Sequence, residues 1–180
     1  MKGLQLISRR PVDISLLLVA LGAFAVGCSE ASEAKEYGVP KSLCGVPVAS
    51  KVLERLLPPG QAIDVQEKSP APSRKLCQVH VDDRLTLAAS QEWWEKTDTL
   101  IGVANAHPKL DSAQPTDSYV YLSSGTGAVG RVKNCTSPDH TRHTLYAIIE
   151  VHAEGVSDAA AMKELITGYA KAVETGGTCR

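Results

Sequence analysis

The chain has 180 residues, of which 43% are hydrophobic and 22% are charged. This share of apolar residues is that of a globular domain and excludes a disordered chain. The formal net charge is −1 and no basic block occurs, so composition gives no support to nucleic acid as a partner. The unusual counts are a single Phe and five Cys.

The first 28 residues have the three zones of a secretory signal. A short basic zone comes first, an apolar stretch follows over residues 14–26, and the segment ends at Cys28. A helix needs about 20 apolar residues to cross the roughly 30 Å core of a bilayer, and this stretch has only about 13. We therefore expect residues 1–27 to be a signal peptide that directs export and is then removed.

The stretch Ala25-Val26-Gly27-Cys28 resembles the lipobox of bacterial lipoproteins, although Ala25 stands where that family more often has Leu. The resemblance implies cleavage after Gly27 and lipidation of the Cys28 thiol, with acyl chains such as palmitate. The membrane is thus the expected partner of Cys28, and the extracytoplasmic face of the cell membrane is the expected location. Two alternatives stay open: a signal peptide in which Cys28 is incidental, and twin-arginine export through Ser8-Arg9-Arg10 in place of ordinary secretion.

Four cysteines follow Cys28, and an exported chain meets an oxidising compartment. Two disulfides are therefore predicted, for which sequence alone permits three pairings. We favour Cys44–Cys77 and Cys135–Cys179, because each pair then joins a predicted helix to a neighbouring predicted strand. In the chain-entropy model each such bond stabilises the fold by about 4 kcal/mol. A zinc site or a redox pair is the alternative, but no Cys-x-x-Cys occurs.

The first half of the chain predicts a tether, a helix and strands. Residues 28–40 are small, polar and charged and predict a flexible tether ahead of an extracytoplasmic domain over residues 41–180. Apolar spacing from Ala49 to Leu57 predicts a helix that ends at Pro58-Pro59-Gly60. Residues 61–67 predict a short strand and residues 68–73 a loop. Two strands then flank a turn at Asp82-Asp83, with Cys77, Val79 and Val81 on one face of the first and Leu85, Leu87 and Ala89 on one face of the second.

In the second half, residues 90–104 are ambiguous, and Trp94, Ile101 and Ala104 favour a short helix. A loop over 105–117 precedes a hairpin of residues 119–123 and 128–134, and residues 144–153 predict the strongest strand. The last helix begins at Ser157 or Asp158, ends at Gly176-Gly177 and buries a stripe of Met162, Leu165, Ile166, Tyr169 and Val173. Short turns between strands imply an antiparallel sheet. The prediction is a single α+β domain with its N- and C-terminal helices packed on one face.

Residues 125–130 match the G-x-G-x-x-G pattern of dinucleotide-binding folds, and Glu150 lies about 20 positions further on. That motif works when a helix follows it and offers its N-terminal N–H groups to a pyrophosphate. Residues 128–143 contain a proline and show no helical stripe. The sequence therefore favours a glycine-rich hairpin turn that uses positive φ, and no cofactor is expected.

Two polar clusters suggest chemistry without specifying it. Asp139, His140 and His143, with His152 on the next strand, either ligate zinc or copper or form a polar surface loop. Glu92, Glu95 and Asp98 around Trp93-Trp94 either form a carbohydrate platform or place one Trp in the core and the acids on a helix surface. Neither cluster has a motif that specifies its chemistry, so no catalytic residue and no metal ligand are assigned.

The lipobox, the polar tether and the expected cysteine pairs together resemble small cell-envelope lipoproteins of actinomycetes, many of which have unknown functions. The body of the resemblance runs from about Leu43 to Cys179 and supplies no catalytic residues. We therefore expect a lipid-anchored extracytoplasmic binding or interaction module for an envelope protein or a small ligand. An envelope enzyme or metal-binding protein that uses His140, His143 and nearby acids is the alternative.

Overall fold

The computed structural model describes residues 34–116 and 121–179. Its strands are β1 (Ser42–Leu43), β2 (Val46–Pro47), β3 (Ile63–Ala71), β4 (Arg74–Val81), β5 (Arg84–Glu95), β6 (Gln114–Pro115), β7 (Tyr121–Ser123), β8 (Gly127–Arg131) and β9 (His143–Val151). Its helices are α1 (Ser50–Glu54), α2 (Leu100–Asn105) and α3 (Ala159–Thr175), with 3-10 turns η1 (Pro108–Leu110) and η2 (Pro138–His140). The predicted signal, Cys28 and residues 117–120 lie outside the described residues.

Seven of the described strands form one antiparallel sheet, in the order β3-β4-β5-β9-β8-β7-β6. β5 and β9 occupy its middle and pair from Leu87 opposite Val151 to Glu95 opposite His143. Tight connections join β3 to β4, β4 to β5 and β7 to β8. A separate ribbon of β1 and β2 precedes α1. The predicted α+β class with a mostly antiparallel sheet is confirmed.

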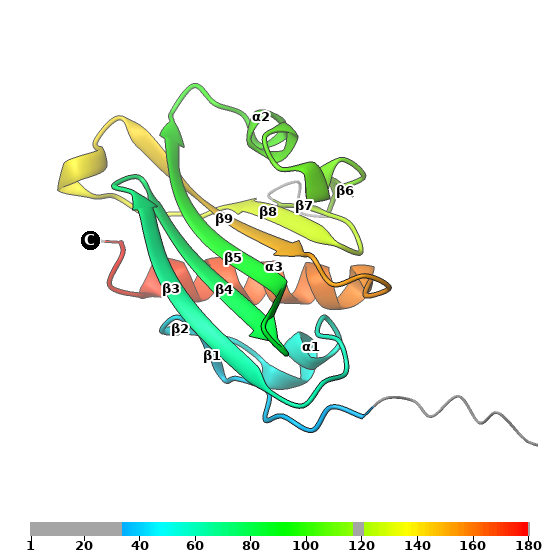
Figure 1. Ribbon diagram of the computed structural model, residues 1–180. Coiled ribbons are helices and arrows are strands. Elements are labelled where there is room, and N and C mark those ends of the chain that lie inside the picture. The colour runs from blue at the N-terminus through cyan, green and yellow to red at the C-terminus, as the bar shows by residue number, and fades with distance from the viewer. Residues whose placement is uncertain (1–33, 117–120, 180) are drawn as a thin grey trace, which may run out of the picture. The chain divides into compact units, whose positions relative to one another are not determined.

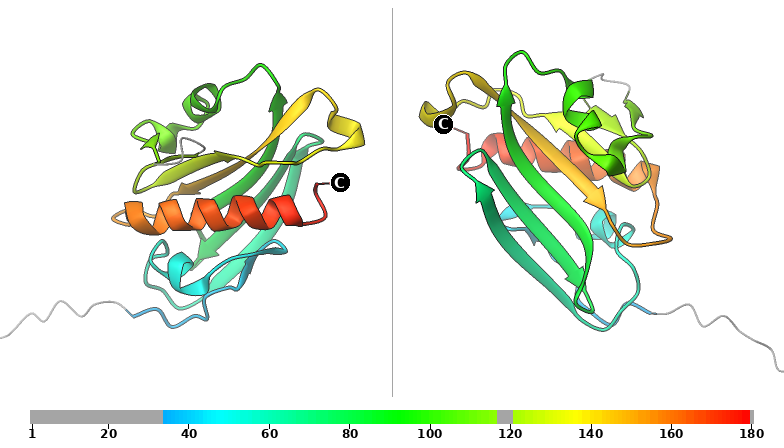
Figure 2. Two further views of the ribbon diagram at one scale, coloured as in Figure 1. Left: turned by 180° about the vertical axis from the view of Figure 1, so that it is seen from behind. Right: turned by 45° about the horizontal axis from the view of Figure 1, so that its top comes forward.

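The two faces of the sheet carry different layers (Figures 1 and 2). α3, α1 and the β1–β2 ribbon cover one face, where Leu145 and Ile149 of β9 belong to the larger apolar core. α2 and η1 cover part of the other face, where Tyr146 and Ile148 pack against Val103 in a smaller core. The side chains of β9 thus belong alternately to the two cores, because successive side chains of a strand point to opposite faces. The prediction that both terminal helices share one face is confirmed.

α3 matches its sequence pattern throughout. Asp158 is the N-cap, and its carboxylate accepts the backbone N–H of Ala161 at 2.9 Å. All five residues of the predicted stripe are buried. The helix stops before Gly176, as predicted.

The β3–β4 hairpin is longer than predicted. β3 continues through Pro70 to Ala71, so the loop expected over residues 68–73 is wrong for its first four residues. β3 is an edge strand, where a proline removes no ladder hydrogen bond, and a register shift between Lys68 and Ala71 accommodates it. The turn at Asp82-Asp83 is confirmed, and both residues have positive φ.

The short helix predicted over residues 90–104 is wrong for its first part. β5 runs on through Trp94 to Glu95, and α2 begins only at Leu100, after Thr99 accepts the N–H of Gly102. Residues 88–92 are all buried because both faces of β5 are covered, so this stretch shows no alternation that would mark it as a strand. Ile101, which the helical pattern would bury, is 62% exposed.

Both predicted disulfides are present. Cys44–Cys77 ties the turn of the β1–β2 ribbon to β4, and Cys135–Cys179 ties the loop after β8 to the chain that follows α3. Disulfides indicate an oxidising environment of the kind found outside the cytoplasm. Among the described helices, none is both long and apolar enough to cross a membrane.

The chain already packs on the domain before residue 41, where the domain was expected to begin. Lys35 forms a β-bridge with Gly60, and the N–H of Glu36 donates to the Gly60 carbonyl at 2.8 Å. Tyr37 packs against the larger core, and its hydroxyl donates to the carbonyl of Pro58. A flexible tether through residue 40 therefore does not describe residues 35–37, which are part of the domain.

Candidate functional site

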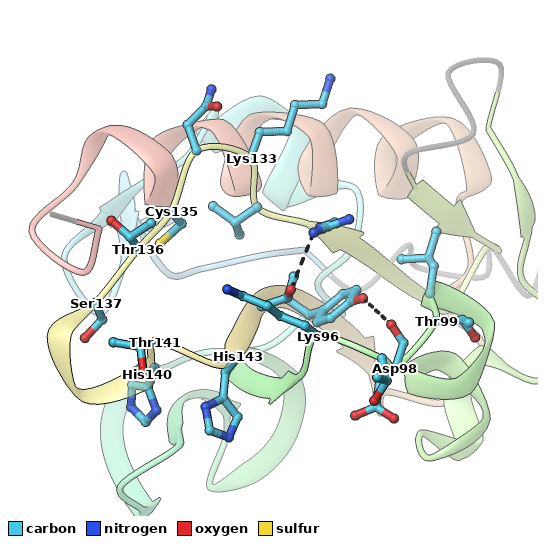
Figure 3. Close-up of a pocket in the computed structure, with 17 residues that line it drawn as sticks. Lys96, Asp98, Thr99, Lys133, Cys135, Thr136, Ser137, His140, Thr141 and His143 are labelled. Carbon is cyan, nitrogen blue, oxygen red and sulfur yellow. Dashed lines mark hydrogen bonds between the residues drawn. The ribbon is translucent and has the colours of Figure 1, made fainter.

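A cavity of about 950 Å³ lies between the connection from β5 to α2 and the loop from β8 to β9. Residues 96–100 and residues 132–137 line the cavity (Figure 3), and Thr144 and Tyr146 of β9 also belong to its lining. Cavities of this size hold small organic ligands. It is therefore the candidate binding site of the domain.

Strand register determines the floor of the cavity. Thr144 and Tyr146 are on the α2 face of β9, and Arg131 of β8 pairs with Tyr146. The Arg131 guanidinium donates to the Thr144 hydroxyl at 3.5 Å, and the Tyr146 hydroxyl donates to the backbone carbonyl of Asp98 at 3.0 Å. Thr144 and Tyr146 are both buried, and burial raises the pKa of the Tyr146 phenol. The floor is thus polar, and Arg131 gives it a positive charge.

The β8–β9 loop is fixed at three points. The Cys135–Cys179 disulfide ties it covalently to the chain after α3. The Asn134 amide donates to Glu174 of α3 at 2.8 Å. The His140 ring stacks on Trp93 with 4.7 Å between ring centroids. This wall of the cavity is therefore held to the rest of the domain at several positions, which favours a preformed site.

Cations outnumber carboxylates in the lining. Lys96, Arg131 and Lys133 bring three positive charges, and Asp98 brings one negative charge. Among the residues that the structure describes, none of these three cations lies within ion-pair distance of a carboxylate. Figure 3 shows Lys96 extending toward the loop that carries Cys135, whereas Lys133 points away from the other lining side chains. Unpaired donors of this kind are suited to a negatively charged group.

The structure brings only part of the predicted histidine cluster together. The rings of His140 and His143 meet edge to face with centroids 5.5 Å apart, and His143 Nε2 lies 3.4 Å from Glu95 Oε1. Asp139 is exposed and does not line the cavity, and His152 lines a different one. Across residues 34–116 and 121–179, no group of three or more His, Cys, Asp or Glu is arranged to hold a metal ion.

The acids around Trp93-Trp94 do not share a helix surface, so that expectation is wrong. Glu92 and Glu95 lie on β5, Asp98 lies in the connection to α2, and only Glu92 is buried. Trp93 packs against the larger core and Trp94 against the smaller one, so each Trp is a core residue in part. The three acids consequently have three different surroundings.

A buried charged network, which the sequence did not reveal, lies under the segment that joins α2 to η1. His107 Nε2 is 3.5 Å from Glu92 Oε2, and His107 Nδ1 is 3.3 Å from Glu150 Oε2. Arg74 Nε lies 2.8 Å from Glu92 Oε1, and the Ser90 hydroxyl donates to the same oxygen at 2.7 Å. Glu150 is thus a partner of His107 and not the ribose-binding acid of a nucleotide site.

Burial and hydrogen bonding oppose each other in this network. Burial alone would lower the pKa of His107, but its hydrogen bonds to Glu150 and Glu92 outweigh that effect and raise the pKa to about 9. Burial would also raise the pKa of both carboxyls, yet the bonds to His107 hold the pKa of Glu92 and of Glu150 below the usual range. His107 is therefore a cation at neutral pH that is shared between two carboxylates.

The glycines of the G-x-G-x-x-G match serve packing. The β7–β8 hairpin contains them as predicted, but Gly125, Gly127 and Gly130 do not have positive φ, so that part of the prediction is wrong. A Cβ on Gly127 would lie 2.6 Å from the carbonyl oxygen of Lys109, and one on Gly130 would lie 2.1 Å from the Tyr121 ring. These close approaches explain why residues without a side chain occupy these positions.

No protein-family model, curated protein or solved structure matches the chain. The chemistry of the cavity is therefore inferred from its own side chains. These offer two cationic groups near a hydroxyl-bearing floor, beside the apolar side chains of Leu100 and Val132. Such a set is suited to holding a ligand by charge, hydrogen bonds and apolar contact.

Proposed function

We propose that this protein is a lipid-anchored cell-envelope lipoprotein that acts as an extracytoplasmic binding module. The cavity between the β5–α2 connection and the β8–β9 loop is the observation that carries the proposal, because its size and its polar floor suit a small ligand. An envelope protein could occupy the same region through a protruding side chain. Anchoring is assigned to Cys28 on the strength of the lipobox-like stretch from Ala25.

Two structural features support an envelope location. The Cys44–Cys77 and Cys135–Cys179 disulfides are of the kind that persists in oxidising compartments. The described domain begins to pack at Lys35, so only a few residues separate it from Cys28. A lipid at Cys28 would therefore hold the domain close to the membrane surface.

A second candidate function is metal binding, with or without catalysis, at His140 and His143. The observation that favours it is the contact of these two rings with each other and of His143 with Glu95, although no group of three or more such side chains in the described residues is arranged to hold a metal ion. Zinc and copper both accept imidazole and carboxylate ligands. Metal analysis of the purified protein after loading with zinc or copper tests this candidate, and the absence of stoichiometric metal would rule it out.

The anchoring proposal is tested with Cys28→Ala in bacterial cells that process lipoproteins. We expect the variant to lose incorporation of labelled palmitate and to leave the membrane fraction or to accumulate unprocessed. Ser29→Ala, at the position after Cys28, serves as the control, and it should keep both the label and the membrane location. Unchanged lipid labelling of Cys28→Ala would refute the anchor.

A further inference from the structure

We infer that the cavity takes a ligand that bears a phosphomonoester, bound at Lys96 and Arg131. This inference rests on the proposed binding function and adds the chemical class of the ligand. The shared chemistry is a compact anion of high charge on a small organic body, whether that body is a soluble metabolite or the headgroup region of a lipid.

Two side chains give the site its positive charge. Lys96 and Arg131 reach the cavity from different elements, the β5–α2 connection and the end of β8. Neither side chain has a carboxylate within ion-pair distance among the described residues. Elsewhere in the same domain, Arg55 and Arg74 each pair with a carboxylate, at 2.7 and 2.8 Å. The two unpaired cations facing one cavity are thus available to an incoming anion.

The floor of the cavity supplies hydrogen-bonding groups. Arg131 already donates to the oxygen of Thr144, which leaves the Thr144 proton free to donate to a ligand. Tyr146 is committed to the Asp98 carbonyl, so its hydroxyl oxygen can only accept. This contact uses the backbone carbonyl of Asp98. The Asp98 carboxylate is the single acidic side chain in the lining, against three basic ones. Arg131, Thr144 and Lys96 thus line one cavity and offer it two cations and a hydroxyl donor.

The size of the cavity favours a ligand larger than a simple ion. A free phosphate ion would leave most of about 950 Å³ unfilled. Leu100 and Val132 add apolar surface beside the charged pair, and Ser137 and Thr141 add hydroxyls on the loop. The site therefore fits an organic phosphate better than an inorganic one.

The test uses the full lipoprotein purified from membranes in a nonionic detergent. Calorimetric titrations compare glucose 6-phosphate, glucose and the short-chain lipid dihexanoylphosphatidic acid. We expect both phosphates to bind, glucose to bind far more weakly, and the affinity for the phosphates to fall as ionic strength rises. Tighter binding of the lipid would identify a lipid headgroup as the source, and tighter binding of the sugar phosphate a soluble ligand.

Charge-neutral variants test the assigned residues. Lys96→Gln and Arg131→Gln should each weaken phosphate binding about tenfold or more, as expected for the loss of a charged hydrogen bond. Lys51→Gln on α1 and Lys171→Gln on α3 are matched controls outside the cavity lining and should stay within about twofold, since exposed charges at a distance are screened.

Each outcome decides the inference separately from the proposed function. Equal binding of glucose and glucose 6-phosphate at the cavity overturns the phosphate inference and leaves a binding module. Full phosphate affinity in both Lys96→Gln and Arg131→Gln, or no binding of either phosphate, also overturns it. The anchoring half of the proposed function depends only on palmitate labelling of Cys28 and is unaffected by these titrations.

Discussion

His107 Nδ1 lies 3.3 Å from Glu150 Oε2, and this contact joins the segment between α2 and η1 to the middle of the sheet. The other ring nitrogen faces Glu92 on β5 at 3.5 Å, so one imidazolium links the two central strands to the layer above them. The side chains of all three residues are at most 12% exposed. A buried charge with two partners is costly to break, because removal of one partner leaves the others uncompensated.

We predict that His107→Gln lowers the free energy of unfolding by about 3–5 kcal/mol, since two carboxylates would remain buried without their shared cation. Chemical denaturation at pH 6 measures the effect. His80→Gln is the control, because His80 is only half buried and its Nδ1 has no hydrogen-bond partner among the described residues. A loss below about 1 kcal/mol for His107→Gln would show that the network contributes little net stability.

The same network predicts a pH dependence of the wild-type protein. The pKa of His107 is raised from 6.5 to about 9 in the folded state, so its stabilisation is complete below pH 6.5 and is lost as pH rises through about 9. The shift corresponds to a free energy on the order of 3 kcal/mol. The lowered pKa values of Glu92 and Glu150 act in the opposite direction, so their stabilisation is lost only as the solution becomes acidic.

Unfolding curves at pH 6, 7.5 and 9 check this dependence. We expect the free energy of unfolding to decline over that range in the wild type and to stay nearly flat in His107→Gln. His152 has a pKa lowered by burial, so its titration falls at or below pH 6.5 and does not produce the decline. A decline of equal size in His107→Gln would assign the pH dependence to another group.

Gly127→Ala should destabilise the fold by about 1–3 kcal/mol, because the new methyl would overlap the Lys109 carbonyl at the base of η1. Gly168→Ala is the matched change on the exposed face of α3, where a Cβ meets nothing within 4 Å. That substitution should stabilise the helix by about 0.5–1 kcal/mol. Thermal unfolding of the two variants compares them directly, and equal effects would contradict the packing role of Gly127.

The two disulfides should contribute similar stability and different local order. Their sequence separations are 33 and 44 residues, so in the chain-entropy model removal of either costs about 4 kcal/mol. The double variant Cys135→Ala/Cys179→Ala should also speed amide exchange over residues 132–142, and Cys44→Ala/Cys77→Ala should not. Equal exchange of that loop in both variants would show that the Cys135–Cys179 bond does not order the cavity wall.

The sequence predicts α3 well because the helix has one buried face, marked by a single apolar stripe and a capping Asp158. β9 is buried on both faces, and its continuous apolar run from Leu145 to Ile149 still marks it as a strand. The second half of β5 is also buried on both faces, but its buried residues include the polar Ser90, Gln91 and Glu92, so it shows neither an apolar run nor an alternation. Cysteine pairing is predictable because the order of helices and strands already limits which sulfurs can meet.

The candidate site is less predictable because its residues meet through register and connections. Arg131 and Tyr146 come together by pairing of β8 with β9, and Lys96 arrives from another connection. His107 has no sequence spacing that links it to Glu92 or Glu150. The one available signal is Glu150 itself, a charge that follows the apolar run from Leu145 to Ile149, because a charged group in such a position usually has a buried partner.

The Cys135–Cys179 bond also sets an order of events during biogenesis. Its two sulfurs are 44 residues apart, and β9 and α3 lie between them. The chain is synthesised from its N-terminus, so the loop that carries Cys135 must wait until α3 and Cys179 have been made. Reducing conditions would postpone the step further. The cavity wall that carries Cys135 is thus fixed to the rest of the domain late, after the sheet and α3 are available.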